Sequence, residues 1–124
     1  MVQSLSLRIG TDMKEMLLDE QSIIEAISGF SPSLNKLCSS LLIKGLTLSQ
    51  GYEAVPVTGK LQLLGLRVSD DLLERLQERA AQLGGEASLN KLSIYLLHVA
   101  LLESLSKRSI RGVRGSGTSG LSYT

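Results

Sequence analysis

Side chains able to perform catalysis are few in this 124-residue chain. It has one histidine, His98, and one cysteine, Cys38. A catalytic nucleophile needs a neighbouring base, and a zinc ion needs several ligands, so neither kind of site is expected. Asp70 and Asp71 are adjacent acids of the kind that stabilises a helix N-terminus. We therefore predict a protein that is not an enzyme and that uses no metal and no cofactor.

Binding chemistry is instead carried by two arginines and by a repeated polar segment. Arg8 stands in the sequence LRI of residues 7–9, and Arg67 stands in LRV of residues 66–68. The segment SLNKL of residues 33–37 recurs unchanged at residues 88–92. A guanidinium can donate two hydrogen bonds to a guanine edge, and the free amides at a helix start can bind a phosphate.

Two copies of one small unit must position these residues. In residues 4–9 an apolar side chain occupies every second position, and in residues 63–68 Leu64, Leu66 and Val68 do the same, which predicts strands with one buried face. Each strand is followed by one helix, and Ser33 and Ser88 are expected to cap a second helix in each copy. Between the strand and the serine that caps the second helix, the first copy is longer than the second by about one helical turn.

The first helix of each copy is expected to begin with a hydroxyl cap and early acids, at Thr11-Asp12 and at Ser69-Asp70-Asp71. Glycines end both helices, at Gly29 and at residues 84–85. Cys38 falls on the apolar side of a second helix, where a small buried side chain is expected. The apolar faces of the two first helices are expected to comprise Met13, Met16, Leu17, Ile24 and Ile27, and Leu72, Leu73, Leu76, Ala80 and Leu83.

One such unit is too small to bury its apolar face, and a single strand leaves both edges unpaired. Two units solve both problems if their strands pair antiparallel and four helices cover one face. We predict a mainly α fold with a two-stranded antiparallel β-ribbon, in the order β-α-α-β-α-α, as an intramolecular pseudo-dimer. The domain is expected to span residues 1–106, with unit one at 3–46, a linker at 47–61 and unit two at 62–106.

Charge is unevenly distributed along the chain. All 12 acidic residues precede Lys107, whereas four of the 13 basic residues lie at or after it. Residues 107–124 are also rich in glycine and serine, so we predict a flexible basic tail. Its Lys107, Arg108, Arg111 and Arg114 are candidates for contacts with a phosphate backbone. No secretory signal and no membrane span are evident, which predicts a cytoplasmic, nucleoid-associated protein without a membrane partner.

The order of these elements resembles the ribbon–helix–helix family of Arc, MetJ and CopG type, here with two units fused in one chain. The resemblance covers residues 3–46 and 62–105. It implies that the ribbon enters the major groove of double-stranded DNA and that the second helices bind flanking phosphates. The implied base-reading residues are Ser4, Ser6, Arg8, Leu63, Gly65 and Arg67, and the implied phosphate-binding residues are Ser33, Leu34, Asn35, Lys36, Ser88, Leu89, Asn90 and Lys91.

The second strand departs from the family pattern at Leu63 and Gly65, which lack polar side chains. Leu63 can touch a thymine methyl group and Gly65 can allow close approach, or else this strand has lost base reading. An asymmetric ribbon would suit a non-palindromic site. The last helix is apolar almost all round, so it is either the most buried helix or one that also contacts another molecule, and we favour association of two chains on the DNA.

The expected function is sequence-specific binding of double-stranded DNA, as a transcriptional repressor or a regulator of plasmid or mobile-element maintenance. No small-molecule substrate is evident. Two alternatives remain open: an antitoxin of a toxin–antitoxin pair, and a protein-interaction module that kept the fold without DNA binding. The acidic body and the weaker second strand favour the second alternative, whereas the tail lacks the apolar residues that an antitoxin would need.

Overall fold

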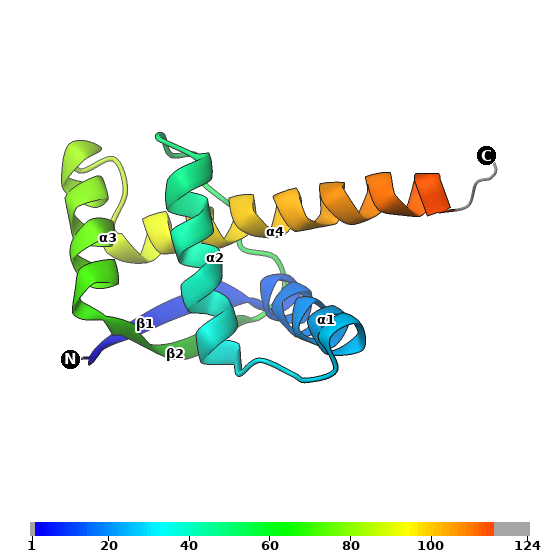
Figure 1. Cartoon of the computed structure of the whole chain (residues 1–124). Coiled ribbons are helices and arrows are strands. Elements are labelled where there is room, and N and C mark those ends of the chain that lie inside the picture. Colours follow the sequence, from blue (N-terminus) through cyan, green and yellow to red (C-terminus); the bar gives the residue numbers. More distant parts are fainter. Residues whose placement is uncertain (1, 116–124) are drawn as a thin grey trace.

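The chain folds into a mainly helical structure with a two-stranded antiparallel sheet (Figure 1). This is a computed structural model, which describes the backbone of residues 2–115 and the side chains of residues 2–107. Within the described residues there are four helices. The elements in chain order are β1 (Val2–Gly10), α1 (Thr11–Ser28), α2 (Leu34–Leu48), β2 (Leu61–Ser69), α3 (Asp70–Gln82) and α4 (Leu89–Gly115).

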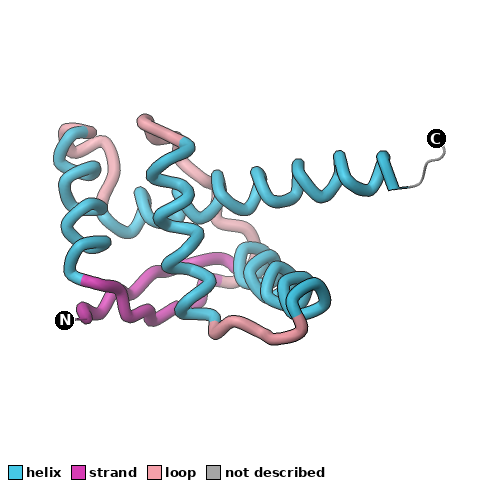
Figure 2. The backbone as a smooth tube through the Cα atoms, in the orientation of Figure 1, coloured by secondary structure: helices cyan, strands magenta, loops and turns pink. Residues whose placement is uncertain are grey.

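The two strands pair along their full length, from Val2 opposite Ser69 to Gly10 opposite Leu61. Alternate residues of both strands are buried, as the sequence pattern predicts. Their buried side chains are the apolar ones, because only one face of the ribbon lies against the helices (Figure 2). The buried set is Leu5, Leu7 and Ile9 in β1 and Leu64, Leu66 and Val68 in β2.

Helices α2 and α4 form the centre of the core above the ribbon. Gly45 of α2 lies against Leu96 of α4, so closely that a Cβ atom on Gly45 would stand 2.5 Å from the Leu96 carbonyl oxygen. Cys38 is fully buried in the same layer, as expected for a small apolar side chain. The close approach of these two helices fixes where their N-termini lie relative to the ribbon.

Serine caps are confirmed at three of the four helix starts. Ser33, Ser69 and Ser88 each accept a hydrogen bond from the backbone N–H three residues later. The prediction is wrong for Thr11, because the N-cap of α1 is Gly10 and makes no side-chain cap bond. The Thr11 hydroxyl instead donates to the carbonyl of Lys60 and accepts from its N–H. It thereby ties the start of α1 to the start of β2.

The first helices differ in length, as the extra residues of the first copy predict: α1 has 18 residues and α3 has 13. Gly29 ends α1 in a left-handed conformation, with φ of 89°. The prediction that Ile27 belongs to the core is wrong, because its side chain is 73% exposed. Ile27 lies in the last turn of α1, whose bounds are Thr11–Ser28.

The connection from α2 to β2, residues 49–60, is held by two contacts that the sequence does not reveal. The Arg79 guanidinium of α3 donates to the carbonyls of Leu46 and Ser49, where α2 ends. The Ser49 hydroxyl is 2.7 Å from the hydroxyl of Tyr95. The end of α2 is therefore fastened to both helices of the second unit.

The last helix is longer than expected. Its backbone stays helical to Gly115, whereas the sequence was expected to become a flexible tail at Lys107. The first glycine of this region is Gly112, so nothing before it opposes continuation of the helix. The C-terminal part of α4 extends past the other elements (Figure 1). The remainder of the predicted tail, residues 116–124, lies outside the described residues.

Candidate nucleic-acid interface

The outward face of the ribbon is open to solvent and carries the predicted base-reading residues. Ser4, Ser6 and Arg8 of β1 are exposed, as are Leu63, Gly65 and Arg67 of β2. Neither strand contains an acidic residue, so the two arginines make this face positive. The structure therefore brings all six predicted residues together on one surface.

The register of the strands places these residues symmetrically. Counted from Arg8 and Arg67, Ser6 and Gly65 occupy equivalent positions, and these two residues pair with each other. Arg8 pairs with Leu63, and Ser4 pairs with Arg67. Exchanging the two strands would leave this pairing unchanged, so an approximate twofold axis passes between Ser6 and Gly65.

Each arginine position is joined to the second helix of the other unit. The Asn35 side chain, at the start of α2, donates to the Arg67 carbonyl at 2.8 Å and accepts from the Arg67 N–H at 2.6 Å. In the opposite half, the Asn90 side-chain oxygen accepts from the Arg8 N–H at 2.9 Å. These bonds use the free edge of each strand, which a two-stranded ribbon leaves unpaired.

These bonds give Asn35 and Asn90 a structural role, and the phosphate contacts expected of them stay a prediction. The resemblance implied that they bind phosphate, but at least one polar atom of each side chain is occupied by a strand. Both side chains hold a helix start against the backbone of an arginine on the ribbon face. A hint was available in the sequence, because asparagine is a good partner for backbone groups that lack one.

The N-termini of α2 and α4 keep the groups that an anion would use. Within an α-helix the first backbone N–H groups have no acceptor, and here the serine caps take only those of Lys36 and Lys91. Leu34 and Leu89 are half-buried against the core. Their backbone amides, rather than their side chains, are therefore the groups that could bind an anion. Lys36 and Lys91 are exposed beside them.

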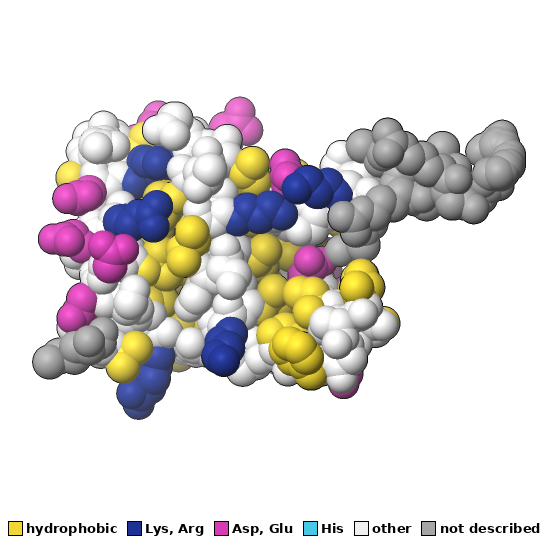
Figure 3. All heavy atoms as spheres, viewed as in Figure 1, with side chains coloured by type: hydrophobic (Ala, Val, Ile, Leu, Met, Phe, Trp, Pro, Cys, Tyr) yellow, Lys and Arg dark blue, Asp and Glu magenta, His cyan; other side chains and the backbone are white. Residues whose placement is uncertain are grey.

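Basic and acidic side chains gather on different parts of the molecule. Basic side chains mark the lower edge of the molecule in Figure 3, where Figure 1 places the strands. Acidic side chains gather over α3, which carries Asp70, Asp71, Glu74 and Glu78. The ribbon face is thus a positive surface on a body whose first 106 residues are acidic in balance.

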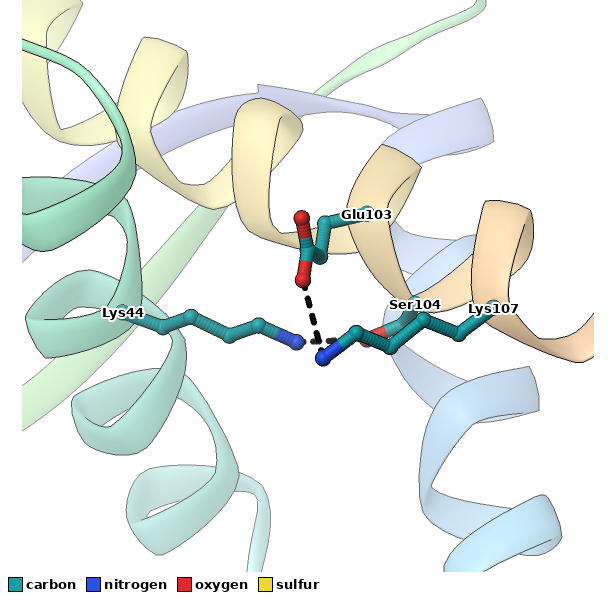
Figure 4. Close-up of polar contacts among 4 residues, drawn as sticks. All are labelled: Lys44, Glu103, Ser104 and Lys107. Atoms are coloured by element: carbon teal, nitrogen blue, oxygen red, sulfur yellow. Dashed lines mark hydrogen bonds and ion pairs between the residues drawn. The ribbon is translucent and has the colours of Figure 1, made fainter.

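The predicted tail contacts receive no support from the described part of α4. Lys107 forms an ion pair with Glu103, with 3.0 Å between Nζ and the carboxylate oxygen, and Lys44 donates to Ser104 beside it (Figure 4). The hydrogen bond from Lys107 lowers the pKa of the Glu103 carboxyl. The side chains of Arg108, Arg111 and Arg114 lie outside the described residues.

The histidine, the cysteine and the acidic side chains that the structure describes form no metal-binding cluster. No group of three or more potential metal-ligating His, Cys, Asp and Glu side chains occurs among them. His98 is half-buried at a small cavity between α1, α4 and the α2–β2 connection. Burial raises the pKa of the Cys38 thiol to about 11, so this thiol stays protonated at neutral pH.

Comparisons with known proteins leave the function to be argued from this surface. No protein-family model matches the sequence, and no significant match is found among curated proteins or solved structures. Within the described residues, no helix is both long enough and apolar enough to span a membrane.

Proposed function

We propose that this protein binds double-stranded DNA in a sequence-specific manner, as a tandem ribbon–helix–helix pseudo-dimer. The observation that carries the proposal is the placement of Arg8 and Arg67. They project from an exposed ribbon about an approximate twofold axis, and each is joined to a helix N-terminus by an asparagine. The backbone of a proposed base-reading residue and a proposed phosphate-binding helix start are thereby held together in each half.

In the proposed complex the ribbon lies in the major groove, which is wide enough for two strands. Each guanidinium donates to O6 and N7 of a guanine, while the serines contact neighbouring base edges. The amides at the starts of α2 and α4, with Lys36 and Lys91, bind phosphates on either side of the groove. Phosphate contacts fix the position of the ribbon, and the ribbon side chains select the sequence.

Each half of the proposed site is built from both units. Arg8 of unit one is joined to α4 of unit two, and Arg67 of unit two is joined to α2 of unit one. One unit alone therefore lacks a complete half-site. This arrangement favours fusion in one chain, because the binding surface is present without association of two polypeptides.

The proposed biological consequence is that the bound protein excludes other proteins from its DNA site. This would repress transcription from a promoter, or regulate maintenance of a plasmid or mobile element. Association of a second chain on neighbouring DNA remains part of the proposal, with exposed Leu102 and Leu105 of α4 as contact candidates.

Selection of binding sites from random duplexes tests the proposal directly. We expect a defined motif, and we expect Arg8→Ala or Arg67→Ala to weaken binding to it by about tenfold to 100-fold. Arg75→Ala is the matched control, because Arg75 is an exposed arginine on α3 and its loss changes the net charge equally. The proposal fails if no motif is enriched, or if the ribbon variants bind as tightly as the control.

A further inference from the structure

The two halves of the ribbon face differ in one position next to each arginine. Arg8 stands opposite Leu63, whereas Arg67 stands opposite Ser4. Leu63 is 69% exposed and is therefore not needed by the core. Leu61 and Leu63 are the exposed large apolar side chains of β2, and Leu63 is the one that pairs with an arginine of the ribbon face.

Backbone hydrogen bonds show how close these pairs are. The N–H of Arg8 bonds to Asn90 and that of Arg67 bonds to Asn35, so both point away from the neighbouring strand. In an antiparallel ribbon such residues form non-hydrogen-bonded pairs, whose side chains approach more closely than those of the alternate pairs. Leu63 therefore lies directly beside the Arg8 side chain, and Ser4 lies directly beside that of Arg67.

The centre of the face offers little to distinguish one base from another. Gly65 has no side chain, and a Cβ atom built there would meet nothing within 4 Å. Its partner Ser6 has a hydroxyl, which both donates and accepts and so discriminates poorly between bases. Differences between the halves must then come from Leu63 and Ser4.

We infer that the protein recognises two unlike half-sites: guanine beside a thymine methyl group in the Arg8–Leu63 half, and guanine without a methyl requirement in the Arg67–Ser4 half. This inference rests on the proposed DNA-binding function. Leu63 is its specificity-determining residue. A leucine side chain gains by covering the C5 methyl of thymine, the one apolar group in the major groove.

Replacing single thymines by deoxyuridine in the selected duplex tests the inference, because it removes only that methyl group. At one position, in one half of the site, we expect the affinity of the unaltered protein to fall about fourfold, corresponding to about 0.8 kcal/mol for one apolar carbon. Leu63→Ser should bind the thymine and deoxyuridine duplexes equally. Its fold is expected to persist because Leu63 is exposed, and circular dichroism checks this.

The reciprocal variant Ser4→Leu provides a gain-of-function control at the equivalent position. It should acquire an approximately fourfold preference for thymine over deoxyuridine, in the other half of the site. A selected motif that is a perfect inverted repeat, or a deoxyuridine effect that Leu63→Ser does not remove, would overturn the inference while leaving the proposed function intact. Failure to select any motif would overturn both.

Discussion

Asn35 holds Arg67 through both of its backbone polar groups, with the side-chain amide donating at 2.8 Å and the side-chain oxygen accepting at 2.6 Å. The two residues are 32 positions apart and belong to different units. This contact fixes the start of α2 relative to a residue on the exposed ribbon face. It thereby couples the stability of the fold to the geometry of the proposed DNA-binding surface.

Asn35→Ala is expected to lower both the stability of the fold and the affinity for DNA. Loss of the side chain leaves the Arg67 N–H and carbonyl without this partner, which should lower the free energy of unfolding by about 1–2 kcal/mol. It should also weaken binding to the selected duplex, because Arg67 and the α2 N-terminus are no longer held together. Urea denaturation and DNA titration measure the two effects. Ser40→Ala, an exposed substitution on the same helix, is the control and should change neither.

Asn35→Asp separates the two hydrogen bonds. A carboxylate can still accept from the Arg67 N–H, but it cannot donate to the Arg67 carbonyl and places a negative charge near the proposed phosphate. We expect smaller destabilisation than for Asn35→Ala and a larger loss of DNA affinity. Equal affinities of the two variants would argue against a phosphate at this helix start.

Lys36 and Lys91 are expected to contribute to affinity without affecting sequence preference. Each stands exposed at a helix start, where a contact with phosphate would release a counterion on binding. Lys36→Ala or Lys91→Ala should make the slope of log affinity against log salt concentration shallower by about 0.9. Lys44 lies further along α2 and donates to Ser104, so Lys44→Ala is the control and should leave the slope unchanged. An unchanged slope for the first two variants would remove these lysines from the proposed interface.

Periodicity and repetition made most of the fold predictable from the sequence. Alternation in residues 4–9 and 63–68 predicted which strand side chains are buried, and the recurring SLNKL segment predicted two capped helices. These are local patterns, in which a residue's neighbours along the chain decide its environment. The six residues of the ribbon face follow from the same alternation, so their common surface was predictable too.

Contacts between units were not predictable in this way. The family resemblance implies phosphate contacts for Asn35 and Asn90, which stay a prediction, but nothing local in the sequence reveals that a strand edge from the other unit lies within reach. Thr11 was assigned as a cap, although its hydroxyl bonds to Lys60 across the ribbon end. Arg79 attracted no prediction, yet it binds the end of α2. Each of these depends on which segments meet in space, and the register of the ribbon decides that.

Gly45 and Gly65 should respond oppositely to the same substitution. Gly45→Ala places a Cβ 2.5 Å from the Leu96 carbonyl oxygen, so α2 and α4 must separate, at an expected cost of about 1–3 kcal/mol. Gly65→Ala meets nothing within 4 Å and should raise stability by up to about 1 kcal/mol, because glycine is unfavourable within a strand. Urea denaturation of the two variants measures this. Comparable stability for both would mean that the α2–α4 contact is looser than described.

Cys38 is expected to make stability fall at alkaline pH. Burial raises the pKa of its thiol from 9.0 to about 11 in the folded protein, against a weaker opposing effect of Lys14. Between these values the unfolded chain releases a proton that the folded protein retains, so rising pH favours unfolding. The contribution of this thiol to stability is therefore constant below about pH 9 and decreases by up to about 1.4 kcal/mol per pH unit until about pH 11.

Cys38→Ala isolates this effect, since all other titrating groups are shared with the unaltered protein. Alanine leaves a small cavity, so the variant should be less stable at neutral pH. The difference in free energy of unfolding should then shrink as the pH rises from about 9 to about 11, because only the cysteine protein is penalised by thiol ionisation in its unfolded state. A difference that stays constant over this range would show that the folded thiol ionises as readily as the unfolded one, and hence that Cys38 is accessible to water.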